Sequence, residues 1–362
     1  MIAWAVLGAV ALSFGISLLA TPLARQVACR FNMFDVPQRH KAHAGPMPLL
    51  GGSAIFAAVL GPSLLALSLA RIWAATGVPG WLPRELAVHV PGAAAKTPMA
   101  LGILAAAALL HVVGIIDDRR NLSPWLKLGA QAALSAAVVL LCDVRVLTAA
   151  GKTASVVVSV LWLVVITNAF NFLDNMDGLS AGVAAICAAA LLGAAGGIGQ
   201  VFVSGWLCLM LGALLGFLPY NFPPARIFMG DAGSQVVGFL LGVVCCLTTY
   251  VQPGRTNWLY GVFVPVVLMA VPLYDMVSVM VLRIRLRHNP MVGDRRHFSH
   301  RLARRGLSAR ATVLTVYLCT LGTAMSASLL PRVDAAGAAL VMAQTVVILL
   351  VIALLEGGNA KA

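Results

Sequence analysis

Apolar runs of about 20 residues recur along almost the whole chain, and they limit its fold more than any other feature of the sequence. Of the 362 residues, 60% are hydrophobic and only 10% are charged. A soluble globular domain carries about 25% charged residues. Because backbone polar groups must be satisfied internally within a bilayer, these runs predict transmembrane helices. We therefore expect an all-α polytopic integral membrane protein in which residues 1–362 form one transmembrane helical domain.

The apolar runs predict about 11 transmembrane helices. Their approximate ranges are 2–23, 49–70, 98–116, 128–147, 153–170, 179–198, 201–219, 234–251, 258–282, 311–330 and 335–355. Only GGIGQ and its neighbours separate the sixth range from the seventh, so a re-entrant pair is an alternative there. An odd number of spans places the two termini on opposite sides of the membrane.

The basic residues are distributed unevenly between the two sides. One side holds 18 of the 25 Lys and Arg. Its loops are 24–48, 117–127, 171–178, 220–233 and 283–310, followed by the C-terminus. The positive-inside rule makes this side cytoplasmic, so we expect the N-terminus outside and the C-terminus in the cytoplasm. Topology thus explains the net charge of +13, and no nucleic-acid partner is expected.

The acidic residues gather on the same side. Eight of the 12 Asp and Glu lie there, and each of the five loops carries at least one. Carboxylates near the membrane cost desolvation free energy unless they are paired, hydrated or bound to a metal. We therefore expect these five loops to form one active site.

The stretch NAFNFLDNMDGLSAG has a polar residue at every third position. Asn168, Asn171, Asp174 and Asp177 would share one face if the segment were helical. Carboxylate and amide oxygens are the ligands that Mg²⁺ prefers. A solvent-exposed polar face is the alternative, although this stretch continues an apolar span.

The stretch IIDDRRNLSPWLK contains two adjacent carboxylates. Asp117 and Asp118 cannot point in one direction, so we expect two separate functions, or one function and one structural contact. Lys127 is close enough in the chain to pair with them. The alternative is a helix end held by Asp–Arg pairs at the water boundary.

The stretch FMGDAGS places Asp231 between glycines at the start of a span. A carboxylate on such a turn can reach a metal, and backbone N–H groups ahead of a helix favour a phosphate. The alternative is an ordinary helix cap by Asp231 or Ser234, which can coexist with coordination.

Two loops combine basic side chains with histidines. RHKAH contains Lys41 and His43, and HFSHRL contains His297, His300 and Arg301. Such side chains suit a phosphate or diphosphate ligand. The alternatives are a lipid-headgroup anchor for the first loop and topology setting by positive charge for the second.

His111 and Asp275 lie inside the predicted spans 98–116 and 258–282. Intramembrane ionisable groups are functional candidates by default. We interpret His111 as structural, and Asp275 as either structural or supporting the site.

IIDDRRNLSPWLK, NAFNFLDNMDGLSAG and FMGDAGS together resemble, in the same order, the motifs of polyprenyl-phosphate N-acetylhexosamine-1-phosphate transferases. The resemblance extends from about residue 35 to 302. HFSHRL looks like the HIHHRL signature of the GlcNAc-1-phosphate branch. The resemblance implies a bacterial inner-membrane enzyme, often dimeric, that uses Mg²⁺, or Mn²⁺ in its place. Its substrates would be a UDP-N-acetylhexosamine and undecaprenyl phosphate, and the lipid-diphosphate sugar would initiate cell-envelope polysaccharide synthesis.

The resemblance also assigns roles to single residues. Asp231 and Asn171 match the family's Mg²⁺ ligands. Asp117 and Asp118 match the acidic pair beside the lipid phosphate, and Lys127 matches its phosphate-binding lysine.

The remaining matches concern the nucleotide and the sugar. Phe228 matches the aromatic beside the uracil, and Asp177 matches the group that contacts that base. The segment that grips the diphosphate and sugar is matched by His297, His300 and Arg301. Asp174 is expected to support catalysis, and Lys41 and His43 to bind substrate.

Two positions depart from the family pattern. Ser299 replaces the middle histidine of HIHH, and Leu49 stands where an arginine is frequent. Neither change removes a metal ligand. The alternatives are a phospho-MurNAc-pentapeptide transferase and, in a different class, a membrane transporter. A transporter should have polar residues at mid-span and an internal repeat, whereas most acids here lie at one membrane face.

Overall fold

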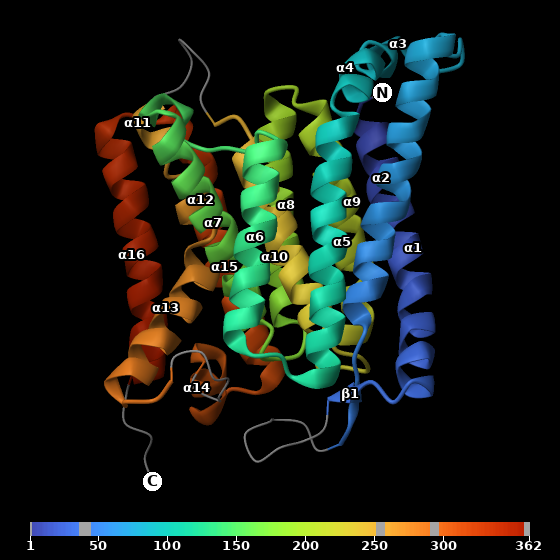
Figure 1. Ribbon diagram of the computed structural model, residues 1–362. Coiled ribbons are helices and arrows are strands. Elements are labelled where there is room, and N and C mark those ends of the chain that lie inside the picture. Colours follow the sequence, from blue (N-terminus) through green and yellow to red (C-terminus); the bar gives the residue numbers. More distant parts are fainter. Residues whose placement is uncertain (1, 36–44, 251–257, 290–296, 358–362) are drawn as a thin grey trace.

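The computed structural model describes residues 2–35, 45–250, 258–289 and 297–357. Figure 1 shows a bundle of long helices that run in roughly the same direction or its reverse. The longest are α1 (Ile2–Arg30), α2 (Gly51–Thr76), α5 (Thr97–Arg120), α6 (Pro124–Leu141), α7 (Lys152–Leu173), α8 (Leu179–Gly197), α9 (Val201–Asn221), α15 (Ala309–Leu329) and α16 (Ala335–Gly357).

Shorter elements complete the described structure. They are α3 (Arg84–Ala87), α4 (Val90–Ala95), η1 (Thr148–Ala150), α10 (Asp231–Leu247), α11 (Trp258–Gly261), α12 (Val264–Leu268), α13 (Ala270–Arg285), α14 (Phe298–Arg304) and η2 (Leu330–Arg332). The described strands are β1 (Phe34–Asp35) and β2 (Met47–Pro48), which pair antiparallel with Phe34 opposite Pro48.

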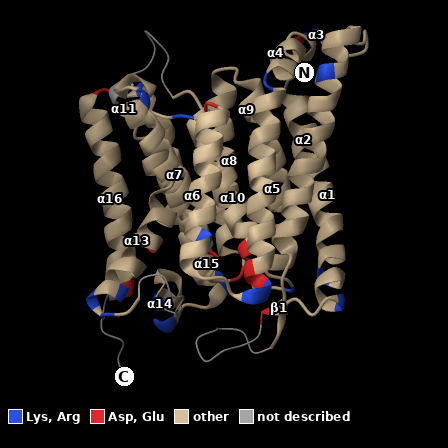
Figure 2. Ribbon diagram, viewed as in Figure 1, with Lys and Arg blue, Asp and Glu red and all other residues tan. Residues whose placement is uncertain are grey.

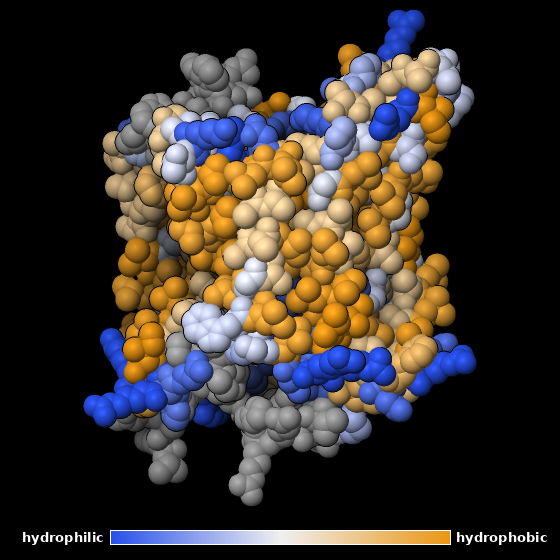
Figure 3. All heavy atoms as spheres, viewed as in Figure 1, coloured by the Kyte–Doolittle hydropathy of each residue, from blue (hydrophilic) through white to orange (hydrophobic). Residues whose placement is uncertain are grey.

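The all-α, multi-pass membrane architecture is confirmed. Nine helices of the described residues are long and apolar enough to cross a membrane. Figure 3 shows the resulting apolar belt between two hydrophilic borders. α8 and α9 are separate candidate spans, which agrees with the division of the sixth predicted range from the seventh.

Two of the 11 predicted ranges do not correspond to such helices. α10, in the range 234–251, is apolar but has only 17 residues. The range 258–282 is divided among α11, α12 and α13. Pro265 and Pro272 explain the breaks. Each lies four residues after the last residue of a helix and has no N–H to donate to the carbonyl of that last residue.

The core of the bundle surrounds α10, nearly all of whose residues are buried. α10 packs against α7, α5 and α2, and α1 lies along α9. Close approach at the start of α10 depends on glycines in its neighbours. A Cβ at Gly52 would overlap the backbone of Gly233, and one at Gly114 would overlap the backbone of Ala232.

α1 begins and α16 ends at opposite ends of the bundle (Figure 1). The end that holds β1 and α14 also holds the start of α10 and is here called the α14 end. Figure 2 shows acidic and basic residues concentrated at the borders of the bundle, with acids beside bases at the α14 end.

Candidate active site

Four helices meet around Asp231, the first residue of α10, at the α14 end. Lys127 of α6 donates from Nζ to Asp231 Oδ2 at 3.1 Å and to Asp117 Oδ2 at 2.6 Å. Asn171 of α7 donates from Nδ2 to Asp231 Oδ1 at 3.0 Å and to Ser234 Oγ at 2.9 Å. Residues that lie more than 100 positions apart in the sequence therefore form one polar cluster.

Asp118 caps α10 from the neighbouring helix α5. Its Oδ1 accepts from the Asp231 backbone N–H at 2.8 Å, and its Oδ2 accepts from that of Ala232 at 3.2 Å. The cap residue of α10 itself, Gly230, offers no side chain. Asp117 and Asp118 thus have different partners, and a carboxylate from another helix, rather than Asp231 or Ser234, satisfies the first N–H groups of α10.

Asp174 lies beside this cluster and feels the charges of Asp231 and Asp118. Within the described ranges, no hydrogen bond or ion pair reaches its carboxylate. Burial, and next the negative charge of Asp231, raise the pKa of Asp174 well above its usual range. Among the described residues, the ammonium group of Lys127 is the one positive charge paired with the four carboxylates of Asp117, Asp118, Asp174 and Asp231, so an added cation would reduce their mutual repulsion.

The polar stripe predicted for NAFNFLDNMDG is only partly helical. α7 ends at Leu173, so Asp174 and Asp177 do not continue its face. The Asn175 side chain contributes to the end of the helix, because its Nδ2 donates to the Phe172 carbonyl oxygen at 2.8 Å in competition with the backbone. Asn168 points elsewhere and donates to Gln131 Oε1 at 2.5 Å.

Asp177 holds the segment that carries Phe228. Its Oδ2 accepts from the Ala225 backbone N–H at 2.8 Å. The Phe228 N–H donates to the Pro48 carbonyl at 2.9 Å, and the Phe228 carbonyl accepts from Gly51 at 2.9 Å. Residues 222–230 are therefore fixed between the 171–178 loop and the start of α2.

α14 brings the HFSHRL residues to the same end of the bundle. His297 Nδ1 lies 2.8 Å from Asp275 Oδ2, and the rings of His297 and His300 are 6.4 Å apart. Arg301 Nη2 pairs with Glu356 Oε2 at 2.9 Å and donates to Ser278 Oγ at 3.1 Å, so it links α14 to α16 and α13. The predicted binding residues Lys41 and His43 lie outside the described residues.

The same sequence is similar to a known family of enzymes. Residues 100–249 match the family model described as glycosyl transferase family 4. A probable undecaprenyl-phosphate N-acetylglucosaminyl 1-phosphate transferase of Bacillus subtilis is 31% identical over 83% of this chain and 78% of its own length. A decaprenyl-phosphate N-acetylglucosaminephosphotransferase of Mycolicibacterium smegmatis is 30% identical over 94% of this chain and 86% of its own. An undecaprenyl-phosphate alpha-N-acetylglucosaminyl 1-phosphate transferase of Escherichia coli is 27% identical over 84% and 78%.

The chain belongs to glycosyl transferase family 4. The matched residues of this family 4 transferase contain the whole cluster around Asp231 and exclude α14.

Two side chains of the cluster, Asp231 and Asn171, have the oxygen-ligand chemistry that Mg²⁺ prefers. The described residues contain no group of three or more His, Cys, Asp or Glu side chains arranged to hold a metal. Mg²⁺ in phosphate-transferring sites is commonly held by one or two carboxylates, with waters and substrate phosphates completing its shell. Asp231 and Asn171 supply such oxygens, provided that the Asn171 amide turns its oxygen, rather than its present donor, toward the ion.

The sequence did not predict the contacts that Ser234, Asn175 and Ser299 make in this site. Ser234 accepts from Asn171, Asn175 contacts α14, and Ser299, the departure from the family histidine, is fully buried with its Oγ 2.5 Å from Asn175 Oδ1. The sequence suggested Ser234 only as a helix cap, although its position one helical turn after Asp231 could have indicated its contact with Asn171. The contact between Asn175 and Ser299 joins residues 124 positions apart and has no local signal.

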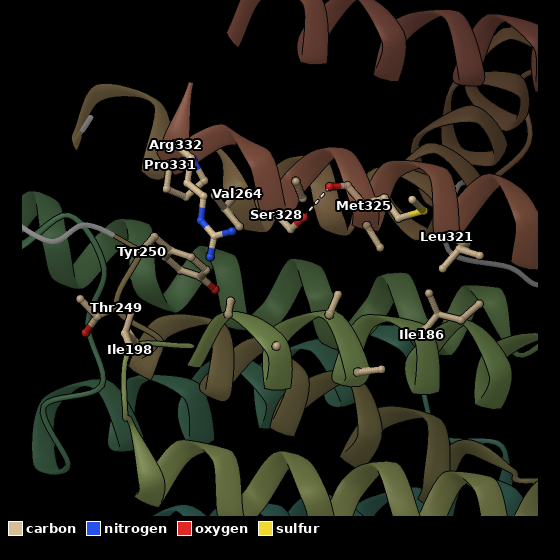
Figure 4. Close-up of a pocket in the computed structure, with 16 residues that line it drawn as sticks. Ile186, Ile198, Thr249, Tyr250, Val264, Leu321, Met325, Ser328, Pro331 and Arg332 are labelled. Atoms are coloured by element: carbon tan, nitrogen blue, oxygen red, sulfur yellow. Dashed lines mark hydrogen bonds between the residues drawn. The ribbon is translucent and has the colours of Figure 1, made fainter. Parts of the chain in front are cut away.

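A cavity of about 460 Å³ lies away from this cluster, between α8, α12, α15 and η2. Figure 4 shows its mainly apolar lining, with the side chains of Arg332 and Tyr250 at one end. Its described lining contains none of the candidate site residues. The cavity is therefore separate from the candidate active site around Asp231.

Proposed function

We propose that this chain transfers N-acetylglucosamine 1-phosphate from UDP-GlcNAc to undecaprenyl phosphate, with release of UMP. The observation that carries the proposal is the cluster around Asp231 in a member of this family. The cluster brings together carboxylate and amide oxygens, a lysine and the N-terminus of α10. The curated relatives, which are named as polyprenyl-phosphate N-acetylglucosamine phosphotransferases, support the substrate assignment. The lipid-diphosphate sugar would then start the synthesis of a cell-envelope polysaccharide.

In the proposed reaction, a phosphate oxygen of the lipid attacks the β-phosphorus of the UDP-sugar. The second pKa of a phosphate monoester is about 6, so the nucleophile is largely ionised at neutral pH and needs no strong general base. Lys127 has three N–H donors, and Asp117 and Asp231 take two. In the part of the chain that the structure describes, the third donor has no acceptor, so we assign it to a phosphate oxygen, and Asp117 orients the ammonium group that binds it.

The start of α10 is held in place by a carboxylate from the neighbouring helix. Asp118 accepts from the first two N–H groups of α10, so the backbone of Asp231 stays fixed within the cluster. Mg²⁺ held by Asp231 and Asn171 would neutralise negative charge on the diphosphate and on the departing UMP. Mn²⁺ would replace it with the same ligands.

The membrane arrangement is part of the same proposal. We propose 11 crossings, with α10 and the α11–α13 series as the two that fall short of full-length helices, and a bacterial inner-membrane location. The α14 end would face the cytoplasm, because it collects most Lys and Arg and must meet a soluble nucleotide sugar. Sedimentation in detergent would test the homodimer that the resemblance implies.

The test is UMP release by the purified protein with Mg²⁺, undecaprenyl phosphate and each of a panel of UDP-sugars. We expect release with UDP-GlcNAc, its loss in Asp231→Asn, and its retention in the control Asp143→Asn. Asp143 is an exposed carboxylate paired with Arg145, away from the cluster. Absence of release with every UDP-hexosamine would contradict the enzyme assignment, and release with UDP-MurNAc-pentapeptide alone would favour the muropeptide branch.

A further inference from the structure

Asp275 is a buried carboxylate on α13 to which the proposed reaction gives no role. Asp275 is 0% exposed, so a carboxylate at this position needs hydrogen-bond donors to compensate for its burial. The donors come from outside α13. His297 Nδ1 lies 2.8 Å from Oδ2, and the Phe298 backbone N–H donates to Oδ1 at 3.2 Å.

The pairing with Asp275 fixes the ring of His297. Nδ1 faces Asp275 at hydrogen-bond distance, and among the described residues Nε2 is the ring nitrogen directed away from this carboxylate. The edge of the ring also meets Phe172, with centroids 5.9 Å apart and planes at 61°. His297 is 5% exposed, so burial restricts the ring further.

The same carboxylate connects α14 with the 171–178 loop. Asn175 Nδ2 approaches Asp275 Oδ2 at 3.4 Å, while Asn175 Oδ1 accepts from Ser299 Oγ at 2.5 Å. Asp275, His297, Ser299 and Asn175 therefore form a continuous polar network. Its far end lies on the loop that follows Asn171, the predicted metal ligand.

We propose that Asp275 is a positioning residue that holds His297 and the start of α14 against the loop that follows Asn171. In this arrangement His297 presents Nε2 to the diphosphate or sugar of the bound substrate in a single orientation. The identity of that substrate rests on the proposed function, whereas the pairing of Asp275 with His297 does not. The buried Ser299 completes the network with a hydroxyl, so this position packs α14 and does not face the sugar.

A double-mutant cycle tests the kinetic part of this proposal. Purified Asp275→Asn, His297→Gln and the double variant are compared with wild type and with the control Asp143→Asn. In metal sites, removing a partner that orients a ligand histidine lowers metal affinity or activity by about 10- to 100-fold. We expect a fall of this size in kcat/KM for Asp275→Asn. The double variant should fall no further than His297→Gln alone, because Asp275 acts through that ring. Losses that multiply in the double variant would overturn the proposal.

Hydrogen exchange tests the structural part without any turnover. In Asp275→Asn we expect faster amide exchange in residues 297–302 and 171–176, with the remainder of the bundle and the Asp143→Asn control unchanged. Unchanged exchange in both segments, or faster exchange throughout the bundle, would overturn the positioning role. If wild type released no UMP from any UDP-sugar, the proposed function would fail, and the exchange result would still decide the role of Asp275.

Discussion

At the scale of single residues, Lys127 is the group whose chemistry is most specific to the proposed reaction. Its Nζ lies between Asp117 and Asp231, and the proposed reaction uses its third N–H donor for a phosphate oxygen. Lys127→Met should lower kcat by about 10²- to 10³-fold, the loss typical of removing one donor from a site that stabilises developing negative charge. Steady-state UMP release measures it, and Lys152→Met, at the exposed start of α7, is the matched control. Activity within a few-fold of wild type in Lys127→Met would contradict the phosphate-binding role.

Asp174 provides a second prediction, on stability and pH. The pKa of the Asp174 carboxyl is higher in the folded protein than its value near 4 in the unfolded chain. The neutral carboxyl therefore contributes its full stability at pH below the unfolded-state pKa, and this contribution is lost as pH rises through the folded-state pKa. In EDTA at neutral pH, Asp174→Asn should therefore raise the thermal midpoint, and the difference should vanish at acidic pH.

Added Mg²⁺ should reduce the advantage of Asp174→Asn, because a cation compensates the charge that the amide removes. Thermal unfolding of wild type and variant in detergent, with and without Mg²⁺, measures both effects. A lower midpoint for Asp174→Asn in EDTA would show that the cluster is not charge-strained.

The residue pattern anticipated some of these contacts and not others. Adjacency alone predicted that Asp117 and Asp118 would serve different partners, as they do. The contacts of Asp275 with His297 and Asn175 span 22 and 100 positions, and no periodicity relates such residues. Their association depends on how α13, α14 and the 171–178 loop pack, which a single sequence does not encode locally.

At the scale of elements, the site depends on how closely α2 and α5 approach the start of α10. Gly52→Ala would place a methyl group in the backbone of Gly233, with no flexible side chain to move aside. We expect it to lower the free energy of unfolding by about 1–3 kcal/mol, as overpacking does, and to lower activity by displacing Asp231.

Gly61→Ala is the matched control for this prediction, because it lies on the same helix and a Cβ there meets open space. An alanine in a helix interior stabilises by roughly 0.5–1 kcal/mol relative to glycine, so this variant should be neutral or slightly more stable. Unfolding midpoints in detergent measure both variants. Equal effects of the two substitutions would show that the contact with Gly233 is unimportant.

Hydropathy predicted where the long helices lie, but it did not predict where an apolar range is divided into shorter helices. The range 258–282 reads as one span by apolarity, but Pro265 and Pro272 divide it by removing donors at fixed distances from Gly261 and Leu268. The prolines were visible in the sequence. Which carbonyl each leaves without a partner becomes evident only once the helix ends are known.

At the scale of the whole molecule, the proposed orientation can be tested with an impermeant thiol reagent. Cys29 is exposed near the end of α1, at the α14 end, and Glu85 is exposed on α3 at the other end. In a background whose other cysteines are alanine, Cys29 should be protected in intact cells and labelled after lysis. Glu85→Cys, made with Cys29→Ala, should be labelled in intact cells. The reverse pattern would invert the proposed topology.

The central claim, that this family 4 transferase moves a sugar together with its phosphate, is tested most directly with doubly labelled substrate. UDP-GlcNAc carrying ³²P at the β-phosphate and ¹⁴C in the sugar is incubated with purified protein, Mg²⁺ and undecaprenyl phosphate, and the lipid is extracted. The account predicts that both labels enter the lipid in equal molar amounts, with one UMP released for each. Lipid that carries ¹⁴C without ³²P, or that carries neither label, would contradict it.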